Sequence, residues 1–316
     1  MGRVLVSELS GASHELVLLD RPGFSKDAIE SGCRADVFGA DISDPESLAD
    51  IEVPKIDCVI HAAGLAHQFG KVRKDDFWKI NVTGTENVAK LAGRLGARHF
   101  ILISSVSVYG KPQEGDSLRT EQTRCRPEGY YAQSKLESES AAGKVCEESG
   151  LDLTILRLAT VVGEGDAGNV SRLIRSVDRK RFFWIGKGAN RKSLLYKGDA
   201  ARACMAVLDK KRKGTEIFNV SGEPVAMRDI VSYIEEALGK KALPGALPPG
   251  LLRAGFAINS KTIGLGKINR LSETVEKWLS DETFSAESIR AAYGFEAKTS
   301  VREAIRREVE WYLDKK

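Results

Sequence analysis

The sequence predicts an α/β fold, a doubly wound parallel sheet with a smaller C-terminal lobe. Short apolar runs, typical of strands buried on both faces, alternate with longer stretches of helical periodicity. Such an alternation implies helical crossovers between parallel strands. After Gly163 the alternation loosens, proline and glycine cluster at Leu243–Gly250, and short helical pieces run to the end. This change marks the second lobe.

The individual elements follow from the same two periodicities. Strands are predicted at Glu15–Leu19, Cys58–Ala62, Phe100–Ser104 and Leu153–Leu158, and helices at Asp75–Leu95, Tyr131–Ser149 and Val170–Val177. Ile217–Val220 is predicted to return to the sheet as a further strand. The first lobe is therefore expected over residues 1–165 with return segments near 190–222, and the second over most of 166–316.

Composition excludes several classes of function. The chain of 316 residues has 42% hydrophobic and 29% charged residues and a net charge of +4, as in a soluble globular protein rather than a nucleic-acid binder. No apolar stretch is long enough to span a bilayer. The five cysteines form no C-x-x-C pair, so we predict no metal site and no disulfide framework, and we expect a reducing, cytoplasmic compartment.

The start of the chain resembles a dinucleotide-binding fold that begins late. Such a fold opens with a strand, a glycine-rich turn and a helix that holds the pyrophosphate at its N-terminus. Here Val4–Leu9 fits a helix packed on a sheet, and Asp20 ends the next strand, 18 residues after Gly2. We predict that Gly2 is the last fingerprint glycine and that the first strand and two glycines are missing; the alternative is a protein that never had them.

Several strand ends carry residues suited to a dinucleotide. Asp20 favours NAD, since its carboxylate accepts from the ribose hydroxyls, but Arg21 would offset its repulsion of a 2′-phosphate, so NADP stays open. Asp41 and Ile42 are expected near the adenine. Small residues after His61 let the backbone approach a flat cofactor, and His61 itself is interpreted as a core histidine. The predicted cofactor contacts are Gly2, Asp20, Arg21, Asp41, Ile42, Ala62, Ala63, Gly64, Asn81, Tyr131 and Lys135.

Tyr131 and Lys135 form the predicted catalytic base. Their i, i+4 spacing places both on one helix face, and Ser105 lies at the end of an upstream strand. A tyrosine is too weak a base near pH 7, but a nearby ammonium favours the phenolate. Ser105 would orient a substrate oxygen, and Asn81, in the preceding helix, would hold a water or a backbone carbonyl. The alternative is an exposed helical Tyr/Lys pair without catalytic function.

In these features the sequence resembles the extended short-chain dehydrogenase/reductase family, in particular the NAD-dependent epimerase/dehydratase group that includes UDP-glucose 4-epimerase. The resemblance implies a Rossmann-like NAD(P)-binding domain, a substrate-binding second lobe and catalytic roles for Ser105, Tyr131 and Lys135. Leu158 and Val162 depart from the proline and tyrosine usual in the family. The matching stretches are Gly2 with Asp20, His61–Gly64, Asn81–Thr85, Ser104–Gly110, Tyr131–Lys135, Leu156–Leu158 and Leu194–Asp199.

The resemblance also implies a nucleotide-sugar substrate. Asn169 matches a family asparagine near the sugar's phosphates, and Arg191 with Lys192 lies where the family has a diphosphate-binding arginine. The expected function is a 4-epimerase of bacterial polysaccharide precursors. The alternatives are a reductase of a nucleotide-linked 4-keto-hexose and an NAD(P)-binding protein impaired by its truncated start. Relatives often dimerise through helices corresponding to Asp75–Leu95 and Tyr131–Ser149, which makes a homodimer one expectation.

Overall fold

The structure is a computed structural model of the whole chain. It describes residues 1–12, 14–23, 35–53, 55–66, 72–113, 116–166, 168–210, 213–243, 246–247 and 279–316. Cys33 lies outside these residues, and so does most of the proline- and glycine-rich segment Leu243–Gly250. The other four cysteines are free thiols. Among the described residues no helix is long and apolar enough to cross a membrane, and no group of side chains could hold a metal ion.

A four-stranded parallel sheet forms the centre of the molecule. Its strands are β3 (Cys58–His61), β4 (His99–Ser105), β5 (Asp152–Leu158) and β10 (Thr215–Val220), in the order β10-β5-β4-β3. The predicted strands therefore exist, and the segment predicted to return pairs with β5 at the sheet edge. Crossover helices join these strands, which confirms the predicted α/β class.

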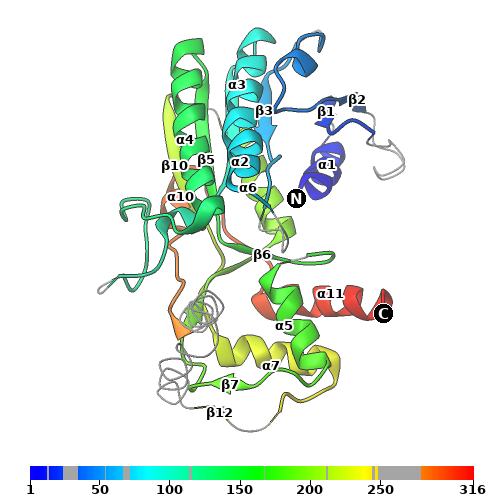
Figure 1. Ribbon diagram of the computed structural model, residues 1–316, viewed down its shortest axis with the longest axis vertical. Helices are drawn as coiled ribbons and strands as arrows, with labels where there is room; N and C mark the ends of the chain where they lie inside the picture. The colour runs from blue at the N-terminus through cyan, green and yellow to red at the C-terminus, as the bar shows by residue number, and fades with distance from the viewer. Residues whose placement is uncertain are drawn as a thin grey trace.

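Helices cover both faces of this sheet, as Figure 1 shows. On one face lie α3 (Gly84–Arg94) and α4 (Gly129–Ser149), which contact each other and the strands. The other face is covered by α1 (Gly2–Gly11), α6 (Lys197–Asp209) and α10 (Glu287–Tyr293). The expected helix at the start of the chain is thus present, and it packs against α6.

Alternating residues of β4 supply the two cores between these layers. Phe100 and Leu102 pack with α3 and α4, whereas Ile101 packs with α1, α6 and α10, and none of the three is exposed to solvent. Successive side chains of a strand point to opposite faces, so a strand buried on both faces must be apolar throughout. The apolar runs in the sequence reflect this double burial.

A second, two-stranded parallel sheet lies beside the first. It consists of β1 (Leu16–Asp20) and β2 (Ala35–Gly39), and no ladder joins it to the four-stranded sheet within the described residues. A small apolar core built on Leu48 of the 3₁₀ turn η2 (Glu46–Leu48) attaches this pair to Leu91 of α3. The two sheets are held together by side-chain packing.

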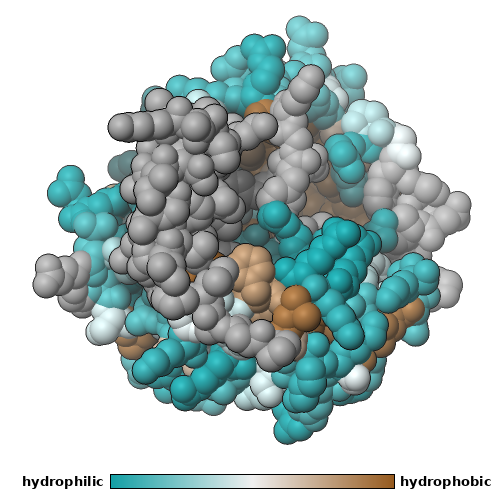
Figure 2. All heavy atoms as spheres, turned by 60° about the horizontal axis from the view of Figure 1, so that its bottom comes forward, coloured by the Kyte–Doolittle hydropathy of each residue, from teal (hydrophilic) through white to brown (hydrophobic). Residues whose placement is uncertain are grey.

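The second lobe is mainly helical. Its core lies between α5 (Asn169–Asp178), α7 (Met227–Leu238) and α11 (Val301–Asp314), together with β6 (Thr160–Val162) and its partner β9 (Leu194–Tyr196). At the far end of the lobe (Figure 2) the described surface is largely hydrophilic, with small separate hydrophobic patches. The short strands of this lobe are β7 (Trp184–Ile185), β8 (Arg191–Lys192), β11 (Val225–Ala226) and β12 (Ala246–Leu247).

Candidate active site

The candidate site lies where β4 ends and α4 begins. Ser105 is the last residue of β4 and caps the 3₁₀ turn η4 (Val106–Tyr109), its Oγ accepting a hydrogen bond from Ser107 N over 3.2 Å. Tyr131 lies in the first turn of α4, which ends at Gly150 in the left-handed conformation. Glycine adopts that conformation at little cost, so it stops this long helix.

The Ser105 side chain interacts with the Tyr131 phenol. Burial raises the pKa of the Tyr131 phenol, and the interaction with Ser105 opposes that rise. The ring of Phe77, in α2 (Lys74–Phe77), meets the Tyr131 ring edge-on with centroids 6.3 Å apart. The structure therefore brings together two of the three residues predicted to be catalytic and shields the phenol on one side.

Lys135, the third, is buried on the same face of α4. Its Nζ donates to the carbonyl oxygen of Ile103 over 2.6 Å. Burial lowers the pKa of the ammonium to about 8, against the attraction of the Glu139 carboxylate, which raises it. A pKa of about 8 leaves most of Lys135 protonated at pH 7, so the charge needed to favour the phenolate is present.

Asn81 fastens the loop after β3 to α4. It lies in a turn of π-helix, η3 (Trp78–Thr83), a rare geometry that is frequent at functional sites. Its Oδ1 accepts from Leu65 N over 2.6 Å, and its Nδ2 donates to Leu65 O (3.1 Å) and to Ser134 Oγ (2.9 Å). Of the two partners expected for Asn81, the structure shows the backbone carbonyl.

Gly64 and His61 behave as their sequence context predicts. A Cβ atom at Gly64 would lie 3.2 Å from Asn81 Oδ1 and 4.0 Å from Lys135 Nζ, so a side chain there would crowd the site. His61 is buried, with its Nε2 3.0 Å from Thr85 Oγ1. Burial lowers the pKa of His61 to about 3, so the ring is neutral and the interpretation as a core histidine is confirmed.

The remaining predicted cofactor contacts lie at or near the carboxyl ends of the other parallel strands. Asp20 ends β1, and its Oδ1 accepts from the backbone of exposed Arg21 over 2.7 Å. Asp41 and Ile42 follow β2; the Asp41 carboxylate accepts from Ser43, which lowers the pKa of Asp41. Ile42 contacts α3, where a Cβ atom at Gly84 would lie 2.8 Å from Ile42 Cδ1.

Two further predicted positions belong to helices. Gly2 is the first residue of α1, and Asn169 is the first residue of α5; both are exposed. Backbone N–H groups at a helix start have no partner within the helix. Both residues therefore lie where a phosphate could accept hydrogen bonds.

The two predicted diphosphate-binding cations already have protein partners. Arg191 donates through Nη2 to Pro224 O over 2.7 Å, while Lys192 Nζ lies 3.0 Å from Glu282 Oε2. Arg191 is exposed, whereas only 12% of the Lys192 side chain is. A diphosphate would have to displace Glu282 to reach Lys192, so Arg191 is the more accessible of the two.

The sequence interpretation missed Glu139 and Ser104 as parts of the site. Glu139 accepts from Ser104 Oγ over 2.5 Å and forms an ion pair with Arg157, which the sequence interpretation placed only within a family-matching stretch. One signal was present: Glu139 follows Lys135 by four residues on the same helix face. No local pattern, however, showed that Arg157 of a later strand would meet it.

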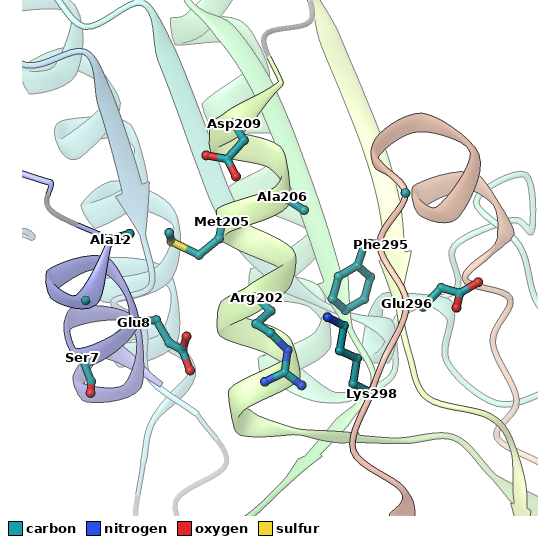
Figure 3. A pocket seen from close by; sticks show the side chains of 12 residues that line it. Ser7, Glu8, Ala12, Arg202, Met205, Ala206, Asp209, Phe295, Glu296 and Lys298 are labelled. Carbon is teal, nitrogen blue, oxygen red and sulfur yellow. The ribbon is translucent and has the colours of Figure 1, made fainter.

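A hollow of the described surface lies away from this site. A cavity of about 700 Å³ opens between α1, α6 and the segment Gly294–Lys298. Figure 3 shows Glu8, Arg202 and Lys298 around it. Of the residues predicted to bind cofactor or substrate, or to be catalytic, none lines this hollow.

Comparison with known proteins decides the family. The sequence profile described as "NAD dependent epimerase/dehydratase family" matches residues 1–221. The chain belongs to the NAD-dependent epimerase/dehydratase family. NAD is accordingly its cofactor. The residues present fit that molecule, since a side chain at Gly64 would crowd Asn81, and an acid ends β1.

Two of the relatives are 4-epimerases named for sugars carried by a diphosphate. The chain is 28% identical over 241 residues to the N-acetyl-alpha-D-glucosaminyl-diphospho-ditrans,octacis-undecaprenol 4-epimerase of Escherichia coli O157:H7, covering 74% of this chain and 71% of that one. It is also 28% identical over 208 residues to the UDP-glucose 4-epimerase of Vibrio cholerae, covering 63% of each chain.

Solved structures agree on the fold. The UDP-glucuronic acid 4-epimerase of Bacillus cereus, in complex with NAD, superposes with a TM-score of 0.75 at 20% identity. The match covers 99% of this chain and 95% of that one. The Rossmann-like architecture predicted for the epimerase/dehydratase family is thus confirmed.

Proposed function

We propose that this epimerase/dehydratase family member is a 4-epimerase of a hexose linked to a nucleoside diphosphate. The observation that carries the proposal is the gathering of Ser105, Tyr131 and Lys135 at the carboxyl end of β4. The 4-epimerase activity of the two curated relatives supports it.

The chemistry requires one proton to leave and return at the same sugar oxygen. Bound NAD would supply reversible hydride transfer at C4 of the sugar, which allows that carbon to invert. Tyr131, as phenolate, takes the proton of the C4 hydroxyl and later gives it back to the resulting oxygen. Ser105 donates a hydrogen bond to that oxygen while its charge changes, and the Lys135 ammonium favours the phenolate.

The second lobe would hold the diphosphate. Arg191 is exposed with five donors in a planar fork, and Asn169 opens α5. A helix N-terminus and a guanidinium both attract phosphate oxygens. Arg191 and Asn169 would then bind the carrier of the sugar, while the site on β4 and α4 reacts with C4.

A substrate panel tests this proposal. The protein with NAD is incubated with UDP-glucose, UDP-N-acetylglucosamine and UDP-glucuronic acid, and product NMR follows inversion at C4. We expect inversion of at least one sugar without net NADH formation. The rate of inversion should fall by about 100-fold or more in Tyr131→Phe. Tyr130→Phe is the matched control: Tyr130 is the preceding residue and is 52% exposed, so the rate should stay within about twofold of that of the unmodified protein.

Two other outcomes lead away from epimerisation. Stoichiometric NADH consumption with a nucleotide-linked 4-keto-hexose would make the protein a reductase that uses the same three residues. Equal rates for Tyr131→Phe and the unmodified protein would refute the assignment of the base.

A further inference from the structure

A buried ion pair lies directly behind the lysine of the site. Glu139 accepts hydrogen bonds from Arg157 Nη2 over 2.6 Å and Nε over 3.0 Å, and from Ser104 Oγ over 2.5 Å. The side chains of Arg157 and Glu139 are only 5% and 4% exposed. Both oxygens of the carboxylate are therefore engaged, in an environment where breaking a buried pair is strongly destabilising.

Three consecutive residues of β4 connect this pair to the site. Ile103 accepts from Lys135 Nζ through its carbonyl oxygen, Ser104 donates to Glu139, and the Ser105 side chain interacts with the Tyr131 phenol. Each of these contacts joins β4 to α4. Ser104 and Glu139 thus fix the strand end against the helix, one helical turn beyond Lys135.

Further hydrogen bonds connect the Arg157–Glu139 ion pair to strands β5 and β10. Arg157 of β5 donates through Nη1 to Tyr109 OH over 3.0 Å, and Tyr109 donates to Asn219 Oδ1 of β10 over 2.7 Å. Each of these side chains is buried. The position of Glu139 is consequently set by the sheet as well as by its own helix.

The Glu139 carboxylate also affects the site electrostatically, because it favours the charged form of Lys135. Lys135 is buried, and Glu139 is the carboxylate that favours its ammonium. The neutral ring of His61 on β3 also lies within reach of the Lys135 charge, and the cation of Arg157 on β5 is paired with Glu139. Without the carboxylate, the buried cations of Lys135 and Arg157 would both lose the negative charge that they interact with.

We propose that Glu139 is a positioning residue, which holds α4 against β4 through Ser104 and keeps Lys135 charged and aimed at the reaction site. The catalytic part of this proposal depends on the proposed function of Tyr131 and Lys135. The electrostatic part can be measured without any substrate.

The first test is a lysine titration by NMR in the whole protein labelled with ¹³Cε-lysine. The Lys135 signal is identified by its loss in Lys135→Met. We expect Glu139→Gln to lower the pKa of Lys135 by about one pH unit or more, since a charge beside a buried ammonium is removed. Glu137→Gln, an exposed glutamate on the same helix, should leave it unchanged.

Glu139→Gln leaves Arg157 without its partner and so endangers folding. The double variant Glu139→Gln/Arg157→Gln removes both buried charges, and we expect it to fold and to show a smaller downward shift at Lys135. An unchanged Lys135 titration in either folded variant would overturn the proposal.

The second test uses the active enzyme. In Glu139→Gln, kcat should fall by about tenfold or more at pH 7, with KM for the sugar within about twofold, and the alkaline limb of the pH profile should move to lower pH. A rise in KM alone would indicate a role in substrate binding and contradict positioning. If the unmodified protein inverts no sugar, the proposed function fails, while the NMR titration still tests Glu139.

Discussion

The Nζ of Lys135 is hydrogen-bonded over 2.6 Å to the carbonyl oxygen of Ile103, two residues before Ser105 on the same strand. In the proposed mechanism, the strand that carries the substrate-orienting serine therefore also holds the lysine that favours the phenolate. We expect Lys135→Met to lower kcat by about 100-fold or more at pH 7, within the range for loss of acid–base catalysis. Lys144→Met changes an exposed lysine of the same helix and should have no such effect, as steady-state kinetics will show.

Asn81 is predicted to contribute to stability as well as to cofactor binding. Asn81→Ala removes two part-buried hydrogen bonds to Leu65 and a buried one to Ser134, and a hydrogen bond contributes about 0.5–1.5 kcal/mol. Urea unfolding should show a free energy of unfolding lower by about 2–4 kcal/mol, and KM for NAD should rise as the loop loosens. Asn87→Ala is the control, because Asn87 makes a single bond, to Ile42 O, away from this loop. Equal losses in both variants would refute the special role of Asn81.

Glu308 is predicted to make stability fall as pH rises. Its side chain is 1% exposed, and Oε2 accepts from Gly163 N over 3.3 Å. Burial and the nearby Asp166 carboxylate raise the pKa of Glu308 from 4.5 to about 8. Between these values the folded protein keeps a proton that the unfolded chain releases, so this group lowers the free energy of unfolding by up to about 1.4 kcal/mol per pH unit.

Comparison of two glutamine variants isolates this group. Glu308→Gln should gain stability relative to the unmodified protein between about pH 5 and pH 8, measured by urea unfolding at each pH. Glu310→Gln changes an exposed glutamate of the same helix, so its stability difference should be nearly constant over that range. A constant difference for Glu308→Gln would show that the carboxyl is ionised in the fold.

Asp20 is predicted to select the cofactor. Its carboxylate ends β1, and loss of a ribose-binding acid removes hydrogen bonds to the 2′-hydroxyl and the repulsion of a 2′-phosphate. Asp20→Ala should raise the Kd for NAD about tenfold or more and reduce the preference for NAD over NADP, as calorimetry with each dinucleotide will show. Asp36→Ala removes an exposed acid from the neighbouring strand β2 and should bind NAD normally.

The fold could be predicted because its strands are buried on both sides. A short, continuous apolar run such as Phe100–Ser104 is typical of a strand in the middle of a parallel sheet, and the structure extends that run only to His99–Ser105. For the helix predicted at Asp75–Leu95, the sequence did not show that its geometry changes part-way along. The structure divides it into α2, a π-helical turn and α3, since Asn81 must reach Leu65, a contact that no periodicity encodes.

The site could be predicted only where its residues are close in sequence. Tyr131 and Lys135 are one helical turn apart, and Ser105 ends a recognisable strand. Glu139 and Arg157 meet from α4 and β5, and their partnership depends on the packing of helix on sheet. The sequence also could not show that Lys192 is paired with Glu282, because the two residues are 90 positions apart in the chain.

The separation of β1 and β2 from the four-stranded sheet has a consequence for how the protein opens. Amide protons exchange through cooperative units, and backbone ladders define such units more firmly than side-chain packing does. The strand pair that ends at Asp20 is attached to α3 by apolar contacts and by hydrogen bonds from the Asn87 and Arg94 side chains, with no backbone ladder to the four-stranded sheet within the described residues. We therefore expect it to open while β3, β4, β5 and β10 stay closed. The amides of β1 and β2, which lead to Asp20, would then exchange with solvent far sooner than those of β4, which leads to Ser105.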